Sequence, residues 1–395
     1  MTNRNGAPLH PEIGVIGLMP DAWGDRWMVR THVMTRLGRY FNVVWMNPAH
    51  HWRETWQAWT TQTAGETSLL PGFSAYTPEA WLPTLYRPAW LARLTFRQRL
   101  RRVRQVLESH GCKKIVLYLW LPRFASALSA IPYDASCYHL EDEYSYSPVE
   151  LPLDAAESRL LAAVDLPFML SPALFEKKRS LNPATSFVPG GVDYAAYARA
   201  YPEPADLAQV PRPRIGYSGN IKKQLDWALI DHLITRHPEW SFAFLGPQDP
   251  HEGIAEAVQV LSGRRNVYFL GPKTPAEIPH YPQHFDVCIM PYTNDGYTKF
   301  IYPLKLHEYL AAGRPTVGTP IRSLVDFAHV IALPRTFEEW SAAIAEGLTP
   351  AANTPERCAA RRAVARQFDW DAVVHNIATT IARRLGVDVV ESGSD

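Results

Sequence analysis

The sequence predicts an α/β protein made of two Rossmann-like domains that face each other across a cleft. The chain has 395 residues, which is more than a single hydrophobic core usually supports. Short apolar runs alternate with helical patterns along nearly its whole length, as is typical of parallel sheets built from strand–helix–strand units. A Pro- and Ala-rich stretch at 196–212 separates two such series and marks the break between them.

Each series supplies five apolar runs that we interpret as buried strands. In the first series they are residues 13–19, 42–46, 115–121, 136–140 and 167–171. In the second they are residues 214–219, 241–246, 266–271, 286–291 and 315–319. Two helical patterns follow, at 354–366 and 370–385. We therefore expect an N-terminal domain at 1–200, a second domain at 207–370, and a C-terminal helix and tail at 371–395. In such sheets, ligands bind outside the carboxyl ends of the strands.

Composition and charge exclude several classes of function. Forty basic residues balance thirty-nine acidic ones, so the chain has no global attraction for nucleic acid and none is predicted as a partner. The four cysteines show neither a C-x-x-C pair nor metal-ligand spacing, and no metal is predicted. The N-terminus lacks the features of a secretory signal, and the longest apolar run is far short of the ~20 residues that span a bilayer. These patterns predict a cytoplasmic protein with reduced, buried thiols.

The most informative stretch is Asp286–Thr319. A strand is followed by a polar loop, then by a helix predicted to begin at Pro303 and to be capped by Gly313. Leu306 and Leu310 share the face that packs on the sheet, whereas Lys305 and Glu308 project elsewhere, about 60° apart.

This helix has the chemistry to bind a nucleoside diphosphate. Its N-terminus carries a partial positive charge that suits a pyrophosphate, and Lys305 adds a full one. Glu308, about one turn further on, is able to accept two hydrogen bonds from a ribose diol. The alternative is an ordinary Lys–Glu pair on a solvated helix face.

The segment from Tyr302 to Pro315, YPLKLHEYLAAGRP, closely resembles the donor-site signature of GT-B glycosyltransferases of the group 1 type, including the teichuronic-acid and exopolysaccharide branch. The resemblance implies that Glu308 binds the ribose of a sugar nucleotide. It also implies that Tyr302, Pro303, Leu304 and Lys305 hold the diphosphate and donor sugar, without a metal or other cofactor. Many retaining members carry a second Glu eight positions earlier, where this chain has Phe300, so the donor sugar and the stereochemical outcome stay open.

Two glycine-containing loops support the resemblance. Gly219 and Asn220 follow the first strand of the second series and precede Lys222 and Lys223, where the family meets the pyrophosphate. A solvated Lys pair is the alternative. In the first series, Gly24 matches the loop that the family places over acceptor and donor phosphates.

The first series also offers candidate catalytic and contact residues. Asp142, and after it Glu141, leave a buried strand where a general base would serve transfer to a hydroxyl. A helix N-cap cluster is the alternative. Trp23 and Trp27 are expected to stack on a sugar face, and Arg30 and His32 are candidates for ligand contact.

A basic amphipathic stretch, Tyr86 to Arg104, contains seven arginines and no acidic residue. Trp90, Leu91, Leu94, Leu100 and Val103 form a rough apolar stripe along it. This pattern favours an anionic membrane surface, with a solvated helix packed on the first sheet as the alternative. Peripheral attachment to the inner face of the cell membrane is therefore an open alternative to a purely cytoplasmic location.

Together the patterns predict a transferase that moves a sugar from a nucleoside-diphosphate sugar to a saccharide or lipid-linked acceptor. Two alternatives stay open. One is a GT-B nucleotide-sugar epimerase, which the missing carboxylate at Phe300 disfavours. The other is a non-catalytic scaffold at a membrane surface, which the intact Lys305/Glu308 helix disfavours.

Overall fold

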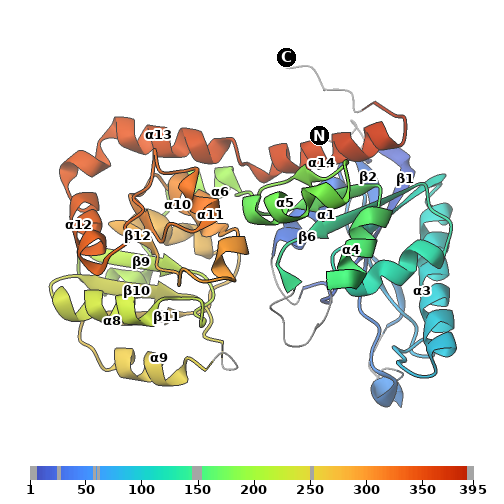
Figure 1. Ribbon diagram of the computed structural model, residues 1–395, viewed down its shortest axis with the longest axis horizontal. Coiled ribbons are helices and arrows are strands. Elements are labelled where there is room, and N and C mark those ends of the chain that lie inside the picture. Colours follow the sequence, from blue (N-terminus) through green and yellow to red (C-terminus); the bar gives the residue numbers. More distant parts are fainter. Residues whose placement is uncertain are drawn as a thin grey trace. The chain divides into compact units, whose positions relative to one another are not determined.

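The computed structural model describes residues 7–24, 28–56, 59, 63–144, 154–249 and 253–388. The chain divides into two compact units (Figure 1). Unit 1 comprises Met1–Pro189 together with Asp371–Asp395, and unit 2 comprises Gly190–Trp370. Each unit contains its own sheet, and we describe the two separately.

Unit 1 is built on an eight-stranded sheet in the order β3-β4-β2-β1-β5-β6-β7-β8. Neighbouring strands are parallel except for the antiparallel pair β3–β4. The strands are β1 (His10–Leu18), β2 (Phe41–Met46), β3 (Gly65–Leu70), β4 (Phe73–Thr77), β5 (Lys114–Leu119), β6 (Ala135–Leu140), β7 (Leu166–Met169) and β8 (Ser186–Phe187). The helices are α1 (Val29–Leu37), α3 (Ala89–Ser109), α4 (Asp154–Ala163), α5 (Pro172–Lys178) and α14 (Trp370–Arg384), with shorter 3₁₀ turns η1 (Trp52–Glu54), η2 (Pro122–Ser129) and η4 (Arg179–Leu181).

Unit 2 is built on a five-stranded parallel sheet in the order β11-β10-β9-β12-β13. Its strands are β9 (Arg214–Ser218), β10 (Ser241–Leu245), β11 (Val267–Gly271), β12 (Val287–Met290) and β13 (Thr316–Gly318). Its helices are α6 (Tyr194–Ala198), α7 (Ala205–Ala208), α8 (Trp227–Arg236), α9 (Ala255–Ser262), α10 (Lys305–Ala311), α11 (Arg322–Val325), α12 (Phe337–Gly347) and α13 (Pro355–Arg366). The 3₁₀ turns are η5 (Ile278–His280), η6 (Pro282–His284), η7 (Thr298–Phe300) and η8 (Pro350–Asn353).

The apolar runs of the sequence form the central strands of both sheets. Every residue of β9, β10, β12 and β13 is buried, because helices enclose the sheet on both faces. Cys137 in β6 and Cys288 in β12 are buried free thiols that pack as small hydrophobes. The predicted fold class, α/β with two Rossmann-like domains, is confirmed.

The boundary between the units lies at Pro189–Gly190, upstream of the stretch at 196–212 where the sequence places it. Part of that stretch forms α6 and α7, and Tyr197, Leu207 and Val210 are buried in the core of unit 2. At the other end, α14 belongs to unit 1. Its Asp371 forms ion pairs with Arg36 of α1 (2.8 Å) and with Arg39 (2.7 Å).

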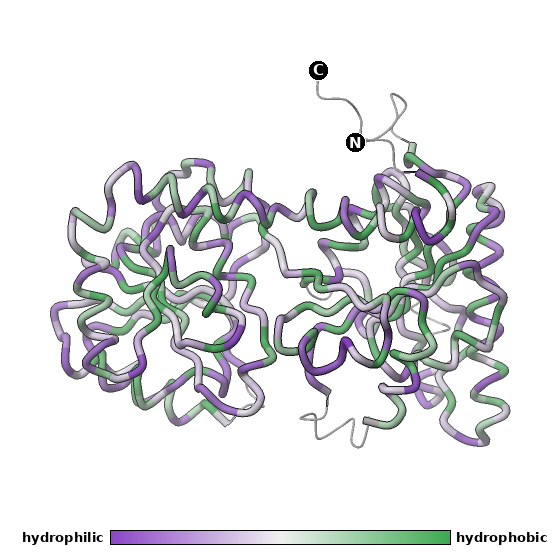
Figure 2. Tube along the Cα trace, turned by 45° about the horizontal axis from the view of Figure 1, so that its top comes forward, coloured by the Kyte–Doolittle hydropathy of each residue, from purple (hydrophilic) through white to green (hydrophobic). Residues whose placement is uncertain are grey.

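The basic stretch at 86–104 forms most of α3, and its apolar stripe divides into two parts. Leu100 and Val103 are completely buried against the sheet, whereas Trp90 and Leu94 in the first turns are exposed. In Figure 2 the trace of α3, at the right edge, alternates accordingly between hydrophobic and hydrophilic residues. The rough apolar stripe of the sequence is therefore packed on the sheet only in its second part. None of the described helices is long and apolar enough to cross a bilayer.

Candidate active site

The helix singled out by the sequence, α10, lies at the carboxyl edge of the unit 2 sheet. Leu306 and Leu310 are completely buried, so the predicted apolar face is confirmed. The hydroxyl of Tyr309 accepts a hydrogen bond from the backbone N–H of Ser218 at the end of β9 (2.7 Å). On its other side, His307 stacks on Phe368 with ring centroids 4.1 Å apart. These contacts fix α10 beside the point where the strand order reverses between β9 and β12.

The Lys305 side chain reaches that reversal point. Its Nζ donates a hydrogen bond to the Tyr292 hydroxyl (2.7 Å), and it lies 4.9 Å from the centre of the Tyr217 ring and 5.3 Å from that of Tyr292. Tyr217 belongs to β9, and Tyr292 comes directly after β12. Two aromatic faces therefore hold a half-buried cation at the strand ends, where an anionic ligand is expected.

Glu308 is half-buried one turn further along α10. Burial raises the pKa of its carboxyl, while Lys305 and a hydrogen bond from the Tyr197 hydroxyl act in the opposite direction. Tyr197 itself is buried in α6, whose N-cap residue Asp193 accepts a hydrogen bond from the Ala196 N–H (3.2 Å). In the sequence Tyr197 falls within the 196–212 break between the two series, and it was not identified as a site residue.

A glycine loop closes over Lys305. Gly219 has φ +136°, and a Cβ at that position would lie only 2.9 Å from Cε of Lys305. A Cβ on Gly246, which follows β10, would lie 2.2 Å from the Gly219 carbonyl oxygen. Only glycine allows these approaches. Asn220 and Lys223 next to this loop are exposed, and Lys222 is half-buried.

The two residues that precede the N-cap of α10 are buried, unlike the exposed residues of a loop that contacts a ligand. Tyr302 and Pro303 are buried, and the Tyr302 hydroxyl is hydrogen-bonded to Nε2 of His307 (2.8 Å). The helix begins at Lys305, with Leu304 as its N-cap, rather than at Pro303, and Gly313 follows the C-cap residue Ala312 with φ +77°. Because of these positions, we expect Tyr302 and Pro303 to position the helix rather than to touch a ligand.

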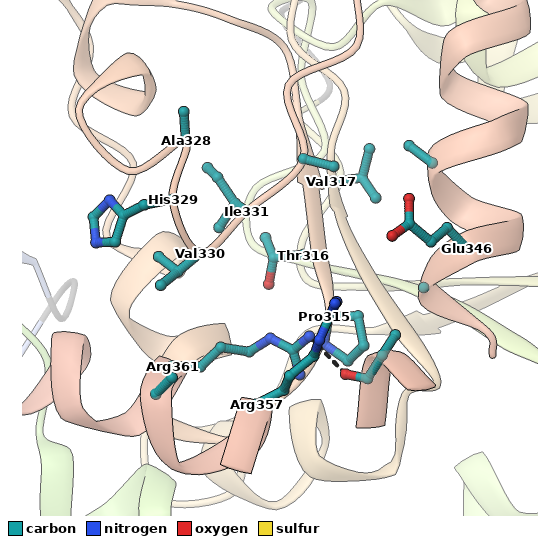
Figure 3. Close-up of a pocket in the computed structure, with 15 residues that line it drawn as sticks. Pro315, Thr316, Val317, Ala328, His329, Val330, Ile331, Glu346, Arg357 and Arg361 are labelled. Atoms are coloured by element: carbon teal, nitrogen blue, oxygen red, sulfur yellow. Dashed lines mark hydrogen bonds between the residues drawn. The ribbon is translucent and has the colours of Figure 1, made fainter. Parts of the chain in front are cut away.

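A cavity of about 480 Å³ lies elsewhere in unit 2, beside the amino end of β13 (Figure 3). Pro315, Thr316, Arg357 and Arg361 are among the residues that line it. Arg361 is already engaged, since it donates hydrogen bonds to the carbonyls of Gly313 (3.2 Å) and Ala352 (2.7 Å). Ligands of parallel sheets bind at the carboxyl edge, so we place the candidate donor site at Lys305 rather than in this cavity.

At the carboxyl edge of the unit 1 sheet, Glu141 follows β6 and faces Arg30 of α1. An Arg30 nitrogen lies 2.8 Å from Glu141 Oε2, and another lies 3.0 Å from Oδ2 of Asp21, which follows β1. Burial raises the pKa of Glu141 to about 7, because the cost of desolvation outweighs the attraction of Arg30. The other oxygen, Oε1, is buried and has no hydrogen-bond partner among the described residues.

The neighbours of Glu141 have other roles. Oδ1 of Asp142 accepts a hydrogen bond from the Glu143 N–H (2.8 Å). Glu143 is completely buried and forms ion pairs with Lys177 (3.0 Å) and Lys178 (3.2 Å), and the hydrogen bonds from these lysines outweigh burial and lower its pKa. The three consecutive acids thus have different roles: Glu141 has a raised pKa, Asp142 stabilises a turn, and Glu143 forms structural ion pairs.

The remaining candidates of unit 1 mostly pack internally. The Trp23 ring packs on Trp45 and Phe73, at centroid distances of 5.4 and 4.8 Å, so this half-buried ring is a packing residue rather than a sugar platform. His32 lies 3.1 Å from an Arg36 nitrogen, and burial lowers its pKa to about 3. Gly24 is exposed, with φ +94°. Trp27 lies outside the described residues.

The chain resembles known proteins in both sequence and fold. Residues 212–349 match the family "Glycosyl transferases group 1". Over 138 residues, the chain is 36% identical to the putative teichuronic acid biosynthesis glycosyltransferase TuaH of Bacillus subtilis, and the aligned part spans 34% of each protein.

Among solved structures, a sucrose-phosphate synthase from Thermosynechococcus elongatus matches with a TM-score of 0.69 at 16% identity, covering 95% of this chain and 99% of that one. The Anabaena protein Alr3699/HepE, solved in complex with UDP, matches with a TM-score of 0.66 at 16% identity, covering 94% of this chain and 100% of that one.

The chain shares its two-domain fold with these solved structures. Residues 212–349 form a glycosyltransferase domain of the group 1 type. The resemblance predicted from the Tyr302–Pro315 segment is therefore confirmed.

Proposed function

We propose that the protein transfers a sugar from a nucleoside-diphosphate sugar to a saccharide or lipid-linked acceptor in the synthesis of a glycan. The observation that carries this proposal is the Lys305 ammonium held between two tyrosine rings at the strand ends, with Glu308 one turn further along the same helix. A relative named for teichuronic acid biosynthesis and a structural neighbour with bound UDP favour the same class of reaction.

In this proposal the donor is held by unit 2. Lys305 neutralises charge on the diphosphate, the backbone at Gly219 allows close approach of the phosphates, and Lys222 and Lys223 add positive charge. Glu308 accepts hydrogen bonds from the ribose hydroxyls. No resident cofactor or metal is required, because Lys305 supplies the positive charge that a cation would otherwise contribute.

Transfer to a hydroxyl releases a proton, and unit 1 contains the candidate bases. Glu141 combines a raised pKa with an oxygen that has no partner among the described residues, which suits proton abstraction near neutral pH. Asp142, the first choice from the sequence, already accepts a backbone hydrogen bond. We therefore propose Glu141 as the base, with Asp142 as the alternative.

Nucleotide binding and turnover test the proposal directly. UDP, GDP, ADP and dTDP are compared by thermal shift, and at about 100 times its Kd a ligand adds about 2.7 kcal/mol of stability. We expect UDP to give the largest shift, and the purified protein to release UDP slowly from a UDP-sugar. No shift with any nucleoside diphosphate would contradict the proposal, whereas a UDP-sugar epimer formed without acceptor would identify an epimerase.

Replacing Tyr197 with phenylalanine should change the pH dependence of nucleotide binding. The Tyr197 hydroxyl lowers the pKa of Glu308, so its removal should raise that pKa and protonate Glu308 at a higher pH. Below its pKa the carboxyl loses acceptor capacity. We expect the loss of affinity on acidification to begin at higher pH in the variant, with affinities matching the wild type at pH 8.5. Titrations from pH 5.5 to 8.5 measure this, and superimposable profiles would exclude the role.

We also propose that unit 1 meets an anionic membrane surface. Arg87, Arg93, Arg97 and Arg101 are exposed at and along α3, and the described residues offer none of them an ion pair. Each such residue near an anionic surface contributes about 1 kcal/mol of attraction. A lipid-linked acceptor would be found there.

A further inference from the structure

Unit 1 exposes an unusual number of tryptophans in one part of its sequence. All five tryptophans that are at least half exposed in the described part of the chain lie between residues 52 and 90. They are Trp52, Trp56, Trp59, Trp81 and Trp90. Tryptophan is among the larger apolar side chains, and exposed apolar patches of this kind mark sites of protein or membrane interaction.

Two segments carry most of these rings and are held side by side. The N–H of Thr84 donates a hydrogen bond to the His50 carbonyl (2.8 Å), and the rings of His51 and Tyr86 lie 5.5 Å apart. Residues 52–56 thereby lie beside the start of α3, at the same end of unit 1 (Figure 1). We call this the aromatic surface, and define it by Trp52, Trp56, Trp59, Tyr86 and Trp90.

The rings of the aromatic surface are not engaged in the core. Trp56 is 77% exposed and Trp90 66% exposed. Trp56 and Trp59 contact each other, with centroids 6.5 Å apart. Leu94, one helical turn beyond Trp90, is also exposed and extends the apolar area along α3.

The charges around the aromatic surface specify its partner. Arg53 lies 5.4 Å from the centre of the Trp52 ring, and Arg93 and Arg97 follow Trp90 on the exposed side of α3. Between Ala80 and Leu107 the sequence contains no acidic residue, and the exposed acid Glu54 accepts a hydrogen bond from the His51 N–H at the start of its own turn (3.2 Å). Indole rings favour the boundary between headgroups and acyl chains, and arginine favours anionic headgroups. The combination of indole rings and arginines therefore favours an anionic bilayer as the partner.

We propose that the aromatic surface inserts its tryptophans into the interfacial layer of an anionic bilayer. This inference extends the membrane attraction of the proposed function, and its test does not depend on transferase activity. Arginine attraction alone is screened by salt, whereas burial of indole rings is not. Vesicle binding should therefore have an electrostatic component that salt removes and an apolar component that salt does not remove.

Vesicle co-sedimentation separates these two parts. The full chain is mixed with phosphatidylcholine vesicles that contain or lack 30% phosphatidylglycerol, at low salt and at 0.5 M NaCl. Three variants are compared. The first combines Trp52→Ser, Trp56→Ser and Trp90→Ser, and the second combines Arg93→Gln, Arg97→Gln and Arg101→Gln. The third, a matched control, replaces the exposed hydrophobic residues Leu181, Phe187 and Phe337 with serine.

We expect the wild type to keep measurable binding at 0.5 M NaCl. The tryptophan variant should lose that salt-resistant part and weaken at least about tenfold at low salt. The arginine variant should weaken about 100-fold at low salt, from about 1 kcal/mol for each arginine. The control should bind as the wild type does, and near-ultraviolet circular dichroism verifies folding.

Two results would overturn the inference. One is a tryptophan variant that is folded and binds vesicles as tightly as the wild type. The other is equal retention of the wild type by double-stranded DNA and by anionic vesicles at matched charge, with the same salt dependence, which would indicate a purely electrostatic surface. Neither result would affect nucleotide binding by unit 2, so the inference fails independently of the proposed transferase.

Discussion

Replacing Glu308 with alanine should weaken UDP binding about 100-fold or more. A carboxylate that accepts two hydrogen bonds from a ribose diol contributes at least about 3 kcal/mol, because hydrogen bonds to charged groups are worth about 1.5–3 kcal/mol each, and 1.4 kcal/mol corresponds to a tenfold change. The side chain is only half-buried, so its removal should leave the fold intact. Isothermal titration of wild type and variant with UDP measures the difference.

A thermodynamic cycle in which both the protein residue and the nucleotide are changed tests whether Glu308 binds the ribose. Wild type should bind 2′-deoxyuridine diphosphate more weakly than UDP, whereas the Glu308→Ala variant should barely distinguish the two. Glu256→Ala, an exposed change on α9 of the same unit, is the matched control and should bind UDP normally. A variant that still discriminates between the two nucleotides as the wild type does would show that another residue reads the ribose.

The strands and the donor helix could be predicted because each depends on local pattern. Runs such as Ile115–Leu121 are apolar without alternation, since a strand of a parallel sheet enclosed by helices is buried on both faces. The pair Lys305 and Glu308 could be identified because helical spacing alone determines which side chains share a face. These features need no knowledge of the rest of the chain.

The partners of these residues could not be predicted in the same way. Tyr197 is more than one hundred residues from Glu308 in sequence, and no local pattern pairs them. Tyr292 could have been identified from the sequence, because it comes directly after a predicted strand, at the edge where ligands bind. The pKa of Glu141 depends on burial, which raises it, and on Arg30 of a distant helix, which lowers it.

The two segments whose structure differed from expectation share a cause. Residues 194–208 lack a long periodic pattern, yet they form α6 and α7 because Tyr197 and Leu207 are buried in the unit 2 core. In α3 the apolar residues follow helical spacing throughout, but the sheet covers only the second part of the stripe. In both segments tertiary packing decides the outcome, and the local sequence pattern gives little signal of it.

Replacing Glu141 with glutamine should remove the pH dependence of turnover. With a pKa of about 7, a general base is protonated and inactive below that pH, so the rate of the wild type should rise with pH through about 7. The glutamine variant should lose about 10²- to 10⁴-fold in rate and show no such rise. The pH profile of kcat measures both effects. If Asp142→Asn removes the rise and Glu141→Gln does not, the alternative base is correct.

The same substitution should change stability in a direction that separates catalysis from structure. Because burial raises the pKa of Glu141 from 4.5 to about 7, the folded chain binds this proton more tightly than the unfolded chain does. The contribution of Glu141 to stability is therefore greatest below pH 4.5 and decreases as pH rises through about 7. The glutamine variant should lack that decrease, as urea titrations at pH 5 and pH 8 would measure. If the variant loses activity but is more stable at pH 8 relative to the wild type, the loss of activity is due to the missing base and not to unfolding.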